Sequence, residues 1–68
     1  MPFVNVMVTK EEVSAEKKHA IIAGVTELLQ RELGKNPATT HVVIQEVDPD
    51  NWGIGGMPCL EYRKTLQT

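Results

Sequence analysis

The sequence of 68 residues lacks the features that usually stabilise small domains. It contains a single cysteine, Cys59, so no disulfide can form within one chain, and we interpret this cysteine as structural. That cysteine and the histidines His19 and His41 have no recognisable metal-ligand spacing, so we expect neither a metal nor a cofactor. A chain of this size buries only about 60% of its unfolded surface. We therefore expect one domain, residues 1–68, that gains further burial as a homo-oligomer.

The chain also carries little net charge and has no long apolar run. Seven Lys and Arg against nine Asp and Glu give a formal charge of −2 without a basic stripe, which argues against nucleic-acid binding. No apolar run approaches the roughly 18 residues of a membrane span, and no signal peptide is visible. The hydrophobic share of 41% is typical of a globular chain. These features predict a soluble, cytoplasmic protein without a membrane partner.

The hydrophobic pattern predicts a strand, a long helix and a second strand. Residues 3–8 and 40–47 are rich in valine and alternate with the period of a strand. Both faces of the first strand are largely apolar, so we expect both to be covered. Between the strands, Ser14 is a suitable helix N-cap, and an apolar stripe at helical spacing ends at Leu33, before Gly34. This order predicts parallel strands joined by a right-handed crossover.

The segments outside this unit carry turn signals. Residues 10–12 form a charged stretch that we interpret as a solvated loop. Residues 52–56 read Trp-Gly-Ile-Gly-Gly, which predicts a tight hairpin and lacks the spacing of a phosphate-binding loop. Residues 61–68 are predicted to be a short polar tail. The expected fold class is therefore α/β (or α+β): a βαβ unit with parallel strands and a short C-terminal β-hairpin.

Pro2 is the strongest candidate for a catalytic residue. An initiator Met that precedes a small residue is commonly removed, so we expect the mature chain to begin at Pro2. An N-terminal proline nitrogen is a secondary amine, whereas an internal one is an amide. Ordinary α-amino groups titrate at about 7.7–8.0, and an apolar pocket lowers that pKa further. Pro2 is thus a candidate general acid and base, and a chain that keeps Met1 loses this chemistry.

These pieces together resemble the 4-oxalocrotonate tautomerase family over nearly the whole chain. The resemblance depends on the short length, on Pro2, on the helix that Ser14 opens, and on the Trp-Gly-Ile-Gly-Gly segment six residues after Glu46. It implies a βαβ unit with a small hairpin, two chains forming a four-stranded sheet, and dimers that usually assemble into hexamers. It also implies an isomerase of aromatic-compound catabolism that interconverts enol (or dienol) and keto forms.

The resemblance also implies roles for single residues. Pro2 takes a proton from the enol and returns it to carbon, and Trp52 corresponds to the aromatic residue of the pocket. Two arginines that bind substrate in the best-known members correspond to Val13 and His41 here, and neither residue can hold a carboxylate in bidentate fashion. His41 can donate one hydrogen bond, and Arg63 is the first choice for the missing cation. We therefore expect weak activity on diacid dienols and better activity on simpler 2-oxo acid enols.

Two other functions stay open. An N-terminal proline also acts as an acid in dehalogenases and decarboxylases of the superfamily, which need arginines and water-activating acids that the sequence does not place. The missing arginines also fit a non-catalytic, oligomeric ligand-binding scaffold of the same fold. The cations besides Arg63 that could reach a pocket are Lys10, Arg31 and Lys64.

Overall fold

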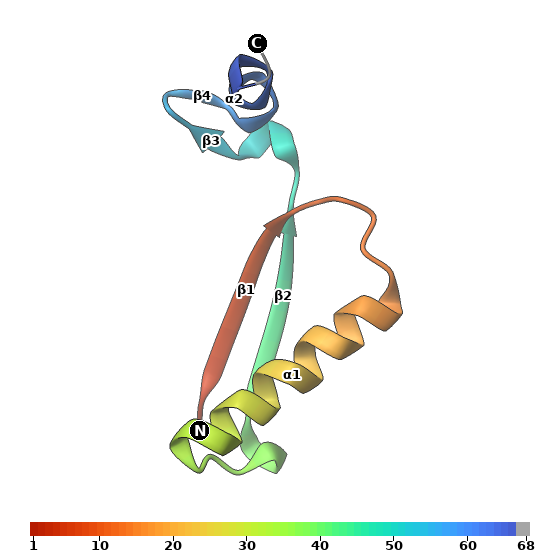
Figure 1. Ribbon diagram of the computed structural model, residues 1–68, viewed down its shortest axis with the longest axis vertical. Helices are drawn as coiled ribbons and strands as arrows, with labels where there is room; N and C mark the ends of the chain where they lie inside the picture. Colours follow the sequence, from red (N-terminus) through yellow and green to blue (C-terminus); the bar gives the residue numbers. More distant parts are fainter. Residues whose placement is uncertain (67–68) are drawn as a thin grey trace.

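The chain folds as a βαβ unit followed by a small C-terminal unit (Figure 1). A computed structural model describes residues 1–66. Strands β1 (Phe3–Thr9) and β2 (His41–Val47) pair in parallel over their full length, and helix α1 (Ala15–Leu33) connects them. The parallel βαβ unit confirms the predicted fold class.

Both ends of α1 have the predicted caps. The Ser14 side chain accepts a hydrogen bond from the Lys17 backbone N–H at 3.2 Å. Gly34 adopts a left-handed conformation with φ 65°, and its N–H donates to the Gln30 carbonyl at 3.0 Å. Since a left-handed residue is least costly when it lacks a Cβ, the helix ends where the glycine stands.

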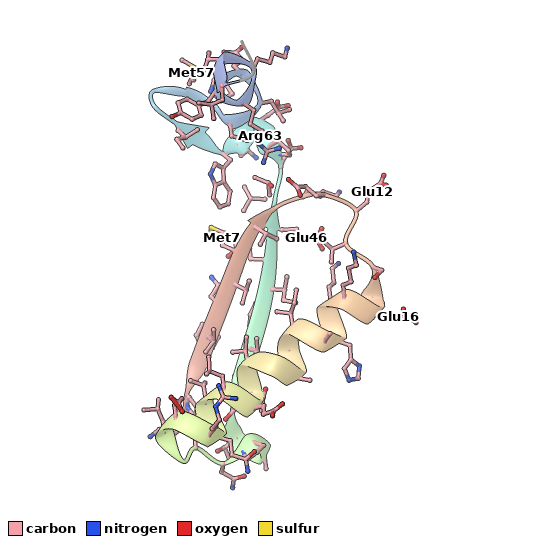
Figure 2. All side chains as sticks on the ribbon, in the orientation of Figure 1. Met7, Glu12, Glu16, Glu46, Met57 and Arg63 are labelled. Atoms are coloured by element: carbon pink, nitrogen blue, oxygen red, sulfur yellow. The ribbon has the colours of Figure 1, made fainter. Side chains whose placement is uncertain are left out.

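The two faces of the β1–β2 sheet differ in burial. The side chains that face α1 are partly buried, among them Val4, Val6 and Ile44. The opposite face is open, with Phe3 67% and Met7 48% exposed, and Met7 points away from α1 (Figure 2). One helix can cover only one face of a two-stranded sheet, so a single chain leaves the other face open, and coverage of both faces stays a prediction for the assembled protein.

The hairpin also forms as predicted. Strands β3 (Gly53–Ile54) and β4 (Met57–Pro58) pair antiparallel around Gly55 and Gly56, whose φ values are 63° and 81°. Positive φ at both turn positions matches a two-residue hairpin loop. Short 3-10 turns at Pro37–Thr39 (η1) and Pro49–Asn51 (η2) precede β2 and the hairpin.

The prediction of a polar tail is wrong for residues 61–66, because these residues belong to helix α2 (Cys59–Leu66). Cys59, Tyr62 and Leu66 recur at helical spacing, and a Cβ placed on Gly55 would lie 3.2 Å from the Tyr62 ring. The helix therefore packs on the hairpin. Residues 67–68 of the predicted tail lie outside the described residues. Figure 1 places α2 and the hairpin beyond the strand ends, at the opposite end from the N-terminus.

No helix within residues 1–66 is both long enough and apolar enough to cross a membrane.

Candidate active site

The candidate site residues form two pairs at opposite ends of the sheet. Pro2 directly precedes β1 and His41 begins β2, and the His41 backbone N–H donates to the Pro2 carbonyl at 3.0 Å. Trp52 and Arg63 lie at the other end, past the last residues of β1 and β2. Six strand steps of about 3.3 Å separate the two ends by roughly 20 Å. One chain therefore does not bring all four residues together.

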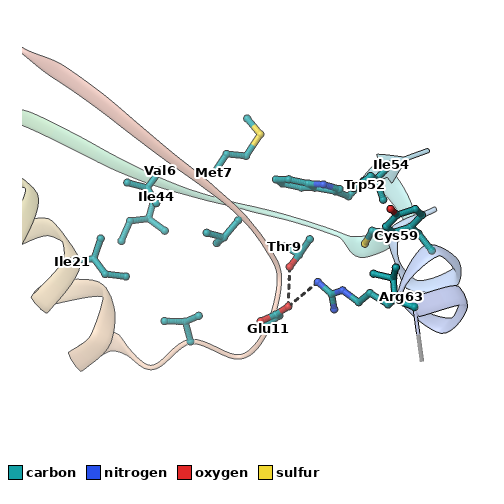
Figure 3. A pocket seen from close by; sticks show the side chains of 14 residues that line it. Val6, Met7, Thr9, Glu11, Ile21, Ile44, Trp52, Ile54, Cys59 and Arg63 are labelled. Atoms are coloured by element: carbon teal, nitrogen blue, oxygen red, sulfur yellow. Dashed lines mark hydrogen bonds and ion pairs between the residues drawn. The ribbon is translucent and has the colours of Figure 1, made fainter. Parts of the chain in front are cut away.

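A cavity of about 550 Å³ lies at the Trp52 end (Figure 3). Its walls come from the C-terminal half of β1, the β1–α1 loop, α1, β2, the hairpin and α2. Most of the lining side chains are apolar, including Val6, Met7, Ile21, Ile44, Trp52 and Ile54. The size and the lining are typical of a small-molecule site.

Glu11 and Arg63 are the charged residues among the described residues that line this cavity. The Glu11 Oε1 atom accepts one hydrogen bond from Thr9 Oγ1 at 2.9 Å and another from Arg63 Nη2 at 3.2 Å (Figure 3). The hydrogen bond from Thr9, followed by the hydrogen bond and the charge of Arg63, lowers the pKa of Glu11 below its ordinary value. The cavity thus holds one cation that is already paired with one anion.

The residues at the two expected arginine positions lie far apart. Val13 lines the cavity and adds an apolar wall where the resemblance implies an arginine. His41 is exposed at the opposite end of the sheet, next to Pro2. Because Met1 precedes Pro2 in the sequence, the Pro2 nitrogen is an amide until Met1 is removed. The roles of Pro2, His41, Trp52 and Arg63 stay predictions.

Glu11 and Tyr62 line the cavity although the sequence predicted neither as a site residue. Glu11 belongs to the stretch interpreted as a solvated loop, and Tyr62 to the stretch predicted as a polar tail. The helical spacing of Cys59, Tyr62 and Leu66 is a signal that could have placed Tyr62. Nothing local to Glu11 indicates that it contacts Arg63, which lies 52 positions further along the chain.

Cys59 has a packing role at this end of the chain. It is 5% exposed, its backbone N–H donates to the Trp52 carbonyl at 2.7 Å, and its Sγ lies 3.5 Å from the Pro49 carbonyl oxygen. These contacts attach the start of α2 to the residue that forms a cavity wall. Within residues 1–66, no group of three His, Cys, Asp or Glu side chains is placed to hold a metal ion.

Comparison with known proteins identifies the family. Residues 2–59 match the family model described as tautomerase enzyme. The chain is 61% identical over 64 residues to probable tautomerase K2 of Dickeya dadantii (94% of this chain, 96% of the relative). It is 38% identical over 61 residues to the 2-hydroxymuconate tautomerase of Pseudomonas putida (90% and 95%). The crystal structure of DmpI from Helicobacter pylori superposes with a TM-score of 0.82 at 37% identity (88% and 98%). The chain belongs to the tautomerase enzyme family.

Proposed function

We propose that this chain catalyses the enol–keto tautomerisation of a small 2-oxo acid, with the Pro2 amine as general acid and base once Met1 is removed. The observation that carries the proposal is that Trp52 and Arg63, from separate elements, line one largely apolar cavity in a chain of the tautomerase family. An apolar wall and one cation suit a ligand with a single carboxylate and a short unsaturated body.

The reaction is an internal proton transfer. The enol oxygen loses its proton to the Pro2 nitrogen, the C=O bond forms, and the electrons of the C=C bond take a proton from the Pro2 ammonium at carbon. Atoms and electrons balance without a cofactor. An apolar site disfavours the charged ammonium, which keeps the Pro2 amine available as a base near neutral pH.

Two side chains are assigned to the substrate. The Arg63 guanidinium binds the carboxylate through charge-assisted hydrogen bonds. His41, which begins the strand beside Pro2, donates one hydrogen bond to the 2-oxygen as negative charge develops there. One guanidinium and one imidazole stabilise a dianionic dienolate less than two arginines would, so we expect diacid dienols to react slowly.

We further propose that the site is built between copies of the chain in a homo-oligomer, a dimer or a hexamer. Within residues 1–66, β1 and β2 pair only with each other, so each strand offers an unpaired edge. Antiparallel pairing of two such sheets brings the Pro2 end of one copy beside the Trp52 end of the other. The exposed Phe3, Met7 and Val43 of the open face would be buried by further association.

The test is the ketonisation rate of phenylenolpyruvate and of an aliphatic 2-oxo acid enol. Intact mass first establishes that Met1 is absent. An Ala inserted between Met1 and Pro2 converts the Pro2 nitrogen into an amide while every other residue stays. We expect this variant to lose about 10²- to 10⁴-fold in rate, the usual contribution of general acid–base catalysis. A rate equal to that of the parent protein would remove Pro2 from the mechanism.

The same preparation separates the alternatives. Turnover of haloacrylates or malonate semialdehyde, with little enol ketonisation, would indicate dehalogenase or decarboxylase chemistry. A mass that includes Met1 in protein from its native host, with no turnover, would indicate a ligand-binding scaffold.

A further inference from the structure

We propose that Glu11 determines substrate specificity: it competes with the substrate for Arg63, keeps the charge of the cavity near zero, and so selects monocarboxylates over dicarboxylates. This inference depends on the proposed function, in which Arg63 binds the substrate carboxylate.

The contact between Glu11 and Arg63 can be displaced. It joins Oε1 to Nη2 at 3.2 Å, and the two side chains are 58% and 48% exposed. Exposed ion pairs of this kind are weak, because water screens the charges and both side chains lose rotational freedom. Arg63 has further N–H donors that a planar carboxylate could engage. A ligand carboxylate in the cavity can therefore replace Glu11 on the guanidinium.

Glu11 stays near the cavity after such a displacement. Its Oε1 also accepts from Thr9 Oγ1 at 2.9 Å, and Thr9 is the last residue of β1. This second contact attaches the carboxylate to the sheet, independently of Arg63. A bound substrate therefore shares the site with a fixed negative charge.

That fixed charge discriminates between ligands by their net charge. Arg63 and Glu11 together contribute zero, so a monocarboxylate leaves the occupied site with one negative charge and a dicarboxylate leaves it with two. Two unit charges about 4 Å apart in a water-like medium change an affinity roughly fivefold. Removing the charge of Glu11 should therefore help every carboxylate, and a dicarboxylate most.

Glu12 supplies a matched control. It is the next residue in the same loop, it is exposed, and its side chain makes no hydrogen bond or ion pair within residues 1–66. Its backbone has φ 40°, a conformation that Gln tolerates as well as Glu does. Glu12→Gln thus removes the same charge from the same loop without touching Arg63.

The experiment uses Trp52 as the reporter, since it is the chain's single tryptophan and it lines the cavity. The full-length protein is titrated by tryptophan fluorescence with 2-oxohexanoate and with 2-oxoadipate, which share six carbons and differ by one carboxylate. We expect the parent protein to prefer 2-oxohexanoate. Glu11→Gln should raise affinity for 2-oxohexanoate about fivefold and for 2-oxoadipate more than tenfold. Glu12→Gln should change either affinity less than twofold.

Binding does not require turnover, so this result is independent of the chemistry at Pro2. In an Arg63→Met background both ligands should bind more weakly, and Glu11→Gln should still raise affinity for 2-oxoadipate more than for 2-oxohexanoate, because Thr9 holds the Glu11 charge at the cavity. Equal effects of Glu11→Gln and Glu12→Gln, weaker binding in Glu11→Gln, or no fluorescence response to either ligand would each overturn the inference. If the variant with Ala inserted before Pro2 loses ketonisation but binds both ligands as the parent does, both the inference and the proposed function are supported. If that variant keeps its ketonisation rate, only the proposed role of Pro2 is refuted.

Discussion

The packing of α2 on the hairpin can be tested at Gly55. A Cβ at this position would lie 3.2 Å from Cδ2 and Cε2 of Tyr62, closer than ordinary van der Waals contact, and the residue has φ 63°. Gly55→Ala should therefore have two costs. The left-handed backbone costs about 1 kcal/mol for a residue with a Cβ, and displacing the Tyr62 ring adds about 1–3 kcal/mol.

Gly56→Ala is the matched control for this change. Gly56 has φ 81°, yet a Cβ there would meet no atom within 4 Å. It should show only the backbone cost of about 1 kcal/mol. Thermal unfolding at a fixed protein concentration should therefore place the Tm of Gly55→Ala below that of Gly56→Ala by about 4 °C or more.

The functional consequence follows from the position of Arg63 on the same helix. If the ring of Tyr62 moves, α2 shifts and Arg63 leaves its place in the cavity, so KM should rise in Gly55→Ala more than in Gly56→Ala. Adding Tyr62→Ala to Gly55→Ala should remove the extra cost of the contact. Equal Tm values for the two glycine variants would refute the packing of α2 against the hairpin.

Two further predictions concern α1 and the ion pair. Gly24 lies inside α1, and a Cβ added there would meet no atom within 4 Å. Gly24→Ala should therefore stabilise the fold by about 1 kcal/mol through its higher helix propensity. A lower Tm would show that another copy packs against this position. The pKa of Glu11 is lowered in the folded chain, so its carboxylate stabilises the fold above the ordinary value of 4.5 and loses that effect as the pH falls through the lowered pKa. Urea unfolding should then find the parent protein more stable than Glu11→Gln at pH 7, with the difference shrinking on acidification; an unchanged difference at about pH 3 would contradict the assignment.

The sequence was sufficient to predict that the candidate site residues lie at two opposite ends of the sheet. Pro2 directly precedes the first strand and residue 41 begins the second, and parallel strands place their first residues at one end of a sheet. Trp52 follows the second strand and must lie at the other end. The predicted topology by itself therefore implies that one chain cannot unite Pro2 with Trp52.

Local patterns determined the βαβ unit and the family. Alternation specified β1 and β2, Ser14 and Gly34 specified the ends of α1, and the Trp-Gly-Ile-Gly-Gly segment specified the hairpin, because each signal acts over a few neighbouring residues. Only the tertiary structure decided α2 and the contact between Glu11 and Arg63. An isolated helix of eight residues is marginal and depends on packing against the hairpin. A contact between residues 52 positions apart exists only once the fold has brought the loop and α2 to the same cavity.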